Sequence, residues 1–277
     1  MTLAKKGVLR PDESLATVDR RELAPRFADL ARQVWVPQWR LPDGVTFDQP
    51  VLQYPAVNVA VKAGTAVAYL PVDGVGVRTL TGSGWAAGVL LRPGAGALVV
   101  PGDHAELLGA EVPIADDALV SSIAAAMAGG LDLDAVVAAY ETWLTPLLDR
   151  VDDETELVNA VCDAAEHDTT ITTPRELYER FDVSERSMQR LLKRRVGFSP
   201  RWLIQRRRLQ EAAFRIREEP EVALAELAAD LGYADQAHFT RDFGKVVGQP
   251  PGDYRRSLGV LPAHAARDGA GTPAQSS

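Results

Sequence analysis

The feature that most limits the fold lies in the last third of the chain, where a short helix, a tight turn and a second helix occur twice in succession. A long helix is expected between the two units, because Ser199-Pro200 is a helix start and apolar residues recur at helical spacing to about residue 217. In each unit a capping residue follows the turn, Ser184 in the first and Asp235 in the second. The duplication predicts an all-α C-terminal domain of seven helices over residues 153–259.

The first unit begins at Thr173-Pro174-Arg175-Glu176, with threonine as the N-cap, proline at the first helical position and glutamate at the third. Its second helix has one apolar face, formed by Met188, Leu191, Leu192 and Val196. The opposite face carries cations and an amide, contributed by Arg186, Gln189, Arg190, Lys193 and Arg194.

The second unit repeats this arrangement. A short amphipathic helix over residues 224–231 is followed by the turn Gly232-Tyr233-Ala234. The next helix ends at Gly248 and is expected to bury Phe239, Phe243, Val246 and Val247. Its outward residues are Gln236, Ala237, Thr240, Arg241 and Lys245.

These outward side chains suit double-stranded DNA as a partner. Arginine can donate two hydrogen bonds to guanine, glutamine can pair with adenine, and lysine can neutralise phosphate. The net charge of the 277 residues is −8, but residues 171–259 hold 17 Lys/Arg and 13 Asp/Glu, a net charge of +4. A basic helix face alone is often only a solvated surface. The ordered duplicate of the motif is what favours DNA binding.

A series of residues in these units matches a known family. It includes Ser184, Arg186, Met188-Gln189-Arg190, Gly197, Ser199-Pro200, Arg208, Ala212, Leu224-Ala225-Glu226-Leu227-Ala228, Gly232-Tyr233, His238-Phe239, Arg241-Asp242-Phe243, Gly248, Pro251 and Tyr254-Arg255. In these positions the chain resembles AraC-type (AraC/XylS) transcription regulators. The resemblance implies that a rigid linking helix places two recognition helices in successive major grooves on one face of the DNA.

The same resemblance assigns base-reading positions to Arg186, Gln189, Arg190, Gln236, Ala237 and Arg241. Two residues depart from the family pattern. Tyr178 stands where the family usually has alanine, and Ala237 offers no hydrogen bond to a base. The second unit is therefore expected to read fewer bases, or to depend more on phosphate contacts and DNA shape.

Residues 23–115 are expected to form a β-rich domain. Short apolar runs at 33–39, 51–61, 65–70 and 88–91 alternate with turn sequences, a spacing typical of a sandwich or small barrel. Residues 116–152 are predicted to be a helical linker or dimerisation region, whose helix over 132–148 either pairs with a second copy or covers its own domain. The class is thus α+β, with disordered ends at 1–22 and 260–277.

Two segments, Arg40-Leu41-Pro42-Asp43-Gly44 and Gly88-Val89-Leu90-Leu91-Arg92-Pro93-Gly94, are similar to the β-rich N-terminal domains of some actinobacterial regulators of this type. The resemblance implies a cupin-like domain that senses an effector or mediates association. A small-molecule effector, RNA polymerase and a second copy of the chain are then candidate partners. Candidate residues for an effector pocket are Trp35, Trp39, Tyr54, Tyr69 and Trp85, although we favour the alternative that they are simply core.

Catalysis, metals and membranes find little support in the sequence. The single cysteine, Cys162, excludes an intramolecular disulfide and a cysteine zinc site, and the four histidines are scattered. The N-terminus lacks a signal-peptide pattern, and no apolar run reaches the ~18 residues that cross a bilayer.

We therefore expect a cytoplasmic transcription regulator with no catalytic residue, metal or cofactor. Two alternatives stay open: a ligand-binding or enzymatic β-domain with a vestigial DNA-binding appendage, and a protein-interaction adaptor.

Overall fold

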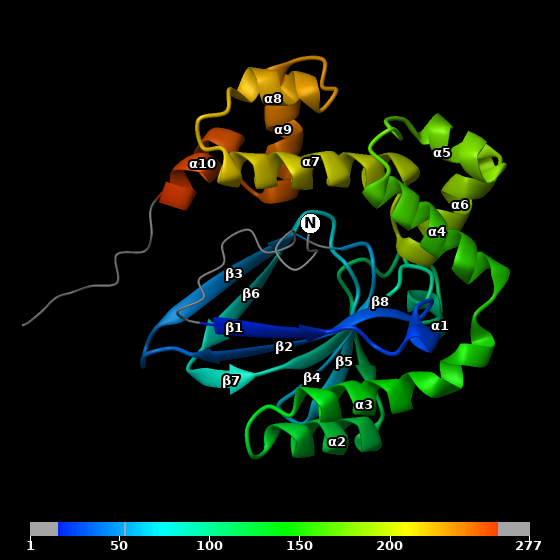
Figure 1. Ribbon diagram of the computed structural model, residues 1–277, viewed down its shortest axis with the longest axis vertical. Helices are drawn as coiled ribbons and strands as arrows, with labels where there is room; N and C mark the ends of the chain where they lie inside the picture. The colour runs from blue at the N-terminus through cyan, green and yellow to red at the C-terminus, as the bar shows by residue number, and fades with distance from the viewer. Residues whose placement is uncertain (1–15, 53, 260–277) are drawn as a thin grey trace, which may run out of the picture.

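The computed structural model describes residues 16–52 and 54–259, and within them a β-rich half is followed by helices (Figure 1). The predicted α+β class is confirmed. The strands are β1 (Ala16–Arg21), β2 (Ala31–Arg40), β3 (Thr46–Leu52), β4 (Asn58–Lys62), β5 (Thr65–Tyr69), β6 (Val75–Thr81), β7 (Ser83–Trp85), β8 (Ala87–Leu91) and β9 (Glu111–Ile114). The tail predicted to be disordered, 260–277, lies outside the described residues.

Most of these strands form one antiparallel sheet in the order β1-β2-β8-β4-β5-β9, with β7 paired to the end of β2. β3 and β6 pair with each other as a separate two-stranded ribbon. Alternate residues of the central strands are fully buried, as the period-two pattern of a strand requires. They include Val34 and Val36 of β2, Val59 and Val61 of β4, and Val89 and Leu91 of β8.

The N-terminal segment differs from its prediction over residues 16–22, while residues 1–15 lie outside the described residues. Disorder is expected over residues 1–22, but residues 16–21 form β1 and pair with β2 from Ala16–Trp39 to Arg21–Val34. An edge strand is held by main-chain hydrogen bonds on one side, so it can form from a polar sequence with mostly exposed side chains. The next segment contains a short 3-10 helix, η2 (Pro25–Phe27), which buries Phe27.

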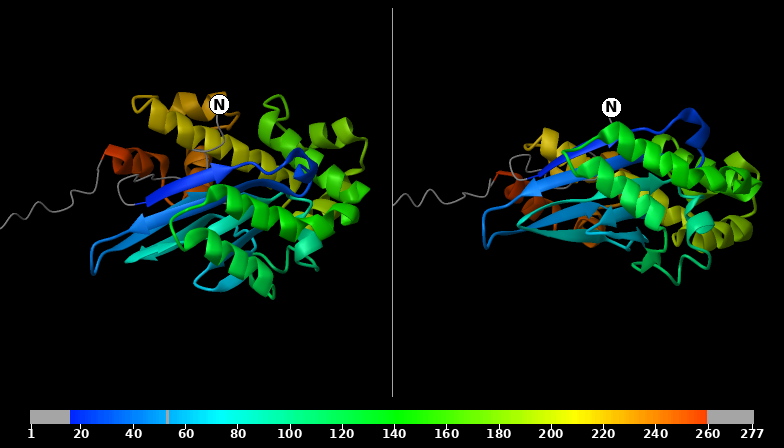
Figure 2. Two further views of the ribbon diagram at one scale, coloured as in Figure 1. Left: turned by 60° about the horizontal axis from the view of Figure 1, so that its bottom comes forward. Right: turned by 90° about the horizontal axis from the view of Figure 1, so that it is seen from below.

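Two helices, α2 (Asp117–Met127) and α3 (Leu133–Leu144), pack on one face of the sheet (Figure 2). The buried stripe of α3 is Val136, Tyr140 and Leu144, and the Tyr140 hydroxyl is within hydrogen-bond distance of the carbonyls of Val59 (3.2 Å) and Ala87 (2.7 Å). This helix therefore covers its own domain, and its pairing with a second copy stays a prediction.

The β-rich domain expected over residues 23–115 is present, as part of one main antiparallel sheet and a separate two-stranded ribbon. The hydrogen-bonded path of described strands runs from β1 to β9 without closing, and helices supply the second layer. These helices lie outside residues 23–115, because the apolar stripes that cover the sheet come from positions after 116.

The C-terminal part consists of helices, with seven from residue 153 onward among the described residues: α4 (Asp153–His167), α5 (Pro174–Phe181), α6 (Glu185–Val196), α7 (Pro200–Glu218), α8 (Leu224–Asp230), α9 (Gln236–Val247) and α10 (Pro251–Gly259). The short α1 (Gly96–Val99) and η3 (Thr145–Arg150) precede them. None of the described helices is both long and apolar enough to cross a membrane.

The long helix α7 holds the two units together. Its first half packs Leu203 and Ile204 into a core with α4, α5 and α6, whereas its second half packs Leu209 and Ile216 into a core with α8, α9 and α10. Figure 1 shows the two groups of helices at opposite ends of α7. A continuous helix therefore fixes the separation of the two units.

Candidate DNA-binding surface

Helix α6 is held by a cap at its start and a glycine at its end. The Ser184 hydroxyl accepts the N–H of Ser187 (3.3 Å), and Gly197 stops the helix with a φ of +89°. Met188 and Leu192 are fully buried beneath it. The outward residues predicted from the sequence, Arg186, Gln189, Arg190, Lys193 and Arg194, are all exposed.

These five side chains differ in their partners. Arg186, Arg190 and Lys193 make no hydrogen bond or ion pair within the described part of the chain. The Arg194 guanidinium instead donates to both carboxylate oxygens of Glu154 at 2.9 Å. The Gln189 amide donates to Glu185 (3.0 Å) and to the hydroxyl of Tyr178 (3.3 Å), the residue that departs from the family pattern.

Arg195 belongs to the interior and not to this surface. It is 8% exposed and donates to the Thr155 hydroxyl at 2.6 Å, with Asp152 at 3.3 Å. Its spacing in the sequence indicates this burial. Arg195 follows the buried Met188 by seven positions and Leu192 by three, which places it on the same face of the helix. Its role is to attach the end of α6 to α4.

Helix α9 is built in the same way. The Asp235 carboxylate accepts the N–H of His238 (2.7 Å), and Gly248 ends the helix with a φ of +83°. The predicted buried residues Phe239, Phe243, Val246 and Val247 are all buried. Of the predicted outward residues, Gln236, Ala237, Arg241 and Lys245 are exposed and Thr240 is half-buried.

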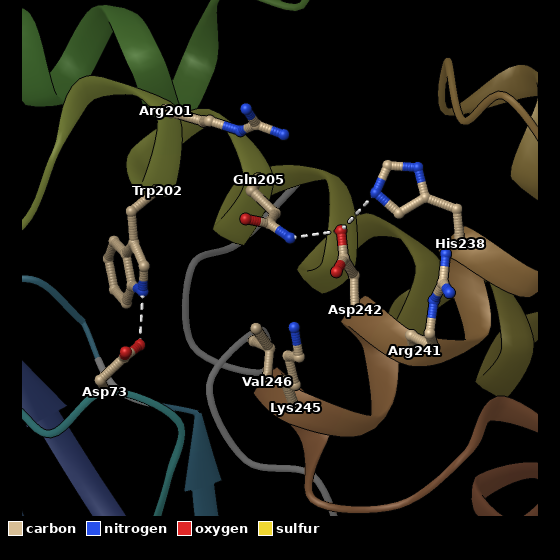
Figure 3. Close-up of a pocket in the computed structure, with 9 residues that line it drawn as sticks. All are labelled: Asp73, Arg201, Trp202, Gln205, His238, Arg241, Asp242, Lys245 and Val246. Atoms are coloured by element: carbon tan, nitrogen blue, oxygen red, sulfur yellow. Dashed lines mark hydrogen bonds and ion pairs between the residues drawn. The ribbon is translucent and has the colours of Figure 1, made fainter.

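One wall of a surface groove is formed by α9, and α7 forms another (Figure 3). The α9 residues are His238, Arg241, Asp242, Lys245 and Val246, and the α7 residues are Arg201, Trp202 and Gln205. A third contribution, Asp73, comes from the loop between β5 and β6 of the β-rich half. The exposed cations of α9, Arg241 and Lys245, therefore share this groove with Asp73, a residue far away in the sequence.

The β-rich half is also joined to the first unit by ion pairs. Arg32 of β2 donates to Asp163 (2.7 Å) and Glu166 (2.9 Å) of α4, and Arg92 also bonds to Asp163. Possible metal-ligating atoms of Asp163, Glu166 and His167 lie within 4.8 Å of one another. Both carboxylates already face arginine, which supplies the positive charge that a metal ion would bring.

Tyr54 lies at the same junction. Its ring is covered by the guanidinium groups of Arg32 (4.3 Å from the ring centroid) and Arg206 of α7 (4.9 Å). Burial raises the pKa of the Tyr54 phenol well above its ordinary value and lowers the pKa of Arg206. Arg206, one of a run of three arginines, is thus a residue of the junction and not of the exposed faces of α6 and α9.

The other aromatic candidates for an effector pocket pack at separate places. Trp35 donates to Asn58 (3.1 Å) and lies over Gly88, where an added Cβ would be 2.3 Å from its ring. Trp39 donates to the Thr81 carbonyl (3.1 Å) and lies over Gly84. Tyr69 is covered by Arg78, and Trp85 packs against the sheet core. None of them lines the groove of Figure 3.

Comparison with known proteins agrees with this geometry. Residues 177–257 match the family model described as "Helix-turn-helix domain". A putative AraC-like transcription regulator of Streptomyces lividans is 29% identical over 126 residues, which are 46% of this chain and 40% of that protein. The C-terminal region is an AraC-type helix-turn-helix domain.

Other relatives match the AraC-type domain as well. The transcriptional activator RhaS of Pectobacterium carotovorum subsp. carotovorum (strain PC1) is 32% identical over 79 residues, 28% of each chain. The chain thus matches less than half the length of these curated relatives. Among solved structures, ToxT from Vibrio cholerae O395 has a TM-score of 0.42 and 10% identity, covering 90% of this chain and 100% of that chain.

Proposed function

We propose that this protein is a sequence-specific transcription regulator that reads two successive major grooves of double-stranded DNA with α6 and α9. The observation that carries the proposal is the duplicated surface. Each helix is capped, anchored by buried apolar residues and joined to α7. Arg186 and Arg190 of α6 and Arg241 of α9 are exposed and have no partner among the described residues. Unpaired, exposed donors on a fixed helix are what base recognition in a major groove requires.

Within this proposal the outward residues have different roles. Arg186 and Arg190 of α6 and Arg241 of α9 bond to base edges, while Lys193 and Lys245 contact phosphates. Gln189 reads a base only when it leaves Tyr178 and Glu185. Gln236 and Thr240 add polar contacts in the second groove, and Ala237 adds apolar contact only. Arg194 contributes least to DNA binding, because its guanidinium is already paired with the Glu154 carboxylate.

The β-rich half supplies regulation in this proposal. It contacts the first unit through Arg32 and Arg92, and it contacts α7 through Asp73, so a change in this half can alter how the AraC-type domain meets DNA. A small-molecule effector or a second copy of the chain would cause such a change in the cytoplasm, and RNA polymerase would respond to it at the promoter.

Selection of bound sequences from a random pool of duplex DNA, using the full chain, tests the proposal. We expect two short motifs about one helical turn apart, ~10 base pairs, because each recognition helix reads one major groove. Enrichment of no motif, together with binding that depends only on salt, would contradict it.

A further inference from the structure

The groove between α7 and α9 is rich in cations that have no carboxylate partner. Arg201, Arg241 and Lys245 are exposed and form no ion pair in the described residues. They extend toward the hollow from two sides, Arg201 from α7 and the other two from α9 (Figure 3). Their mutual repulsion would be lowered by an anionic ligand bound between them.

The acid at the back of the groove does not neutralise these cations. The Asp242 carboxylate accepts a hydrogen bond from the Gln205 amide at 2.5 Å and lies 3.2 Å from the His238 imidazole. Its side chain is only 13% exposed. Asp242 therefore holds α9 against α7, and the open part of the groove keeps its positive character.

We propose that this groove binds a phosphodiester of the DNA backbone, with Arg201 and Lys245 as its donors. The inference rests on the proposed function and extends it to a residue outside both recognition helices. When α9 enters a major groove of DNA, the DNA strand that borders that major groove must pass beside the helix. Arg201, on the opposite wall, then reaches the phosphates of that strand and adds affinity without sequence preference.

Asp73 connects this site to the β-rich half. Its carboxylate accepts the indole N–H of Trp202 at 2.8 Å, and Trp202 stacks on Phe198 with ring centroids 3.7 Å apart. The next residue, Gly74, faces the main chain of α9, where an added Cβ would lie 3.4 Å from the Lys245 carbonyl oxygen. The loop thus places a negative charge at the edge of a phosphate site and weakens DNA binding as long as it stays there.

The test is a salt series of DNA binding by the full chain, on a selected site and on the same duplex with both motifs scrambled. Arg201→Ala should weaken binding to both duplexes by the same factor and reduce the slope of log K against log salt by about 0.9, the value for one phosphate contact. Arg201→Lys should keep most of that slope. Thermal unfolding of each variant verifies that it is folded.

Asp73→Asn tests whether the charge of Asp73 weakens DNA binding, because the amide oxygen still accepts the Trp202 indole N–H while the charge is removed. Binding of both duplexes should become tighter. Asp43→Asn is the matched control, since it makes the same charge change at the far end of the β3–β6 ribbon. The two ends of the ribbon are six strand steps apart, roughly 20 Å, which exceeds the ~10 Å screening length at 0.1 M salt.

These outcomes distinguish failure of the phosphate site from failure of the proposed function on which it rests. A wild-type protein that does not distinguish the two duplexes refutes sequence-specific regulation, while the salt slope of Arg201→Ala still decides whether the groove holds a phosphate. An Arg201→Ala variant with wild-type affinity and slope overturns the phosphate site. Equal effects of Asp73→Asn and Asp43→Asn overturn the contribution of the β-rich half.

Discussion

Lys193, Arg194 and Arg195 are consecutive in α6, yet each has different surroundings. Lys193 is exposed without a partner in the described chain, Arg194 is exposed and bonded to Glu154, and Arg195 is buried against Thr155. Residue type alone gives all three the same charge. The helix face that each occupies, and the element that packs against it, decide whether that charge is available to DNA.

The difference between a paired and an unpaired arginine gives a prediction within α6. Arg190→Ala should cost ~1–3 kcal/mol of specific binding, the usual value of a bidentate arginine–guanine contact. Arg194→Ala removes the same charge but should cost clearly less, because its guanidinium is already engaged by a carboxylate. Fluorescence anisotropy with a selected duplex measures both. Equal losses for the two variants would show that only net charge matters.

At the scale of elements, local signals predicted the helices of the C-terminal domain well. The capping box of Thr173 and Glu176 and the caps Ser184 and Asp235 are all present in the structure. Sequence reasoning was less successful in the β-rich half. Nothing local indicates that β1 pairs with β2, or that α2 and α3 cover the sheet, because both features depend on contacts between distant segments.

The glycines that end or follow helices allow an element-scale prediction. Gly197 and Gly232 both have positive φ, +89° and +74°, so alanine at either position should cost about 1–2 kcal/mol of stability from backbone strain. At Gly197 an added Cβ would also lie 2.6 Å from Leu108 and 2.9 Å from the His104 carbonyl, whereas at Gly232 the nearest atom is 3.5 Å away on a flexible arginine. Gly197→Ala should therefore lower the free energy of unfolding more than Gly232→Ala in urea titrations. The reverse order would contradict the packing at the end of α6.

At the scale of the whole molecule, the β-rich half and the AraC-type domain share an interface centred on α4 and α6. The Asn159 amide bridges them, accepting the N–H of Gly94 and donating to the Asp29 carbonyl, both at 2.9 Å. The exposed outward faces of α6 and α9 could be predicted from the sequence because they depend on helical spacing alone. The groove could not, since Asp73 and Trp202 meet across 129 positions of the chain.

A buried histidine, His104, lies at this interface. His104 is 2% exposed, and its backbone N–H donates to the Arg194 carbonyl at 2.9 Å. Burial, together with nearby Arg195, lowers the pKa of its imidazole below the ordinary value of 6.5. The unfolded chain therefore binds this proton more readily than the folded chain, so the stability that His104 contributes above pH 6.5 is lost as the pH falls toward its folded pKa.

We expect His104→Gln, which keeps a donor for the Val100 carbonyl, to weaken this dependence. The free energy of unfolding of the wild type should fall more steeply than that of the variant as the pH is lowered from above 6.5. Urea titrations across this range measure the difference. Parallel curves would mean that His104 accepts its proton as easily in the folded protein as in the unfolded chain.

The central claim is that α6 and α9 each read their own half of a site, and one measurement tests it most directly. Binding of the wild type, Arg190→Ala and Arg241→Ala is compared on a selected duplex and on duplexes with either motif altered. We predict that Arg190→Ala loses discrimination at one motif only and Arg241→Ala at the other only. If both variants instead bind every duplex more weakly by the same factor, the arginines contact phosphate alone, and the account of two reading helices is wrong.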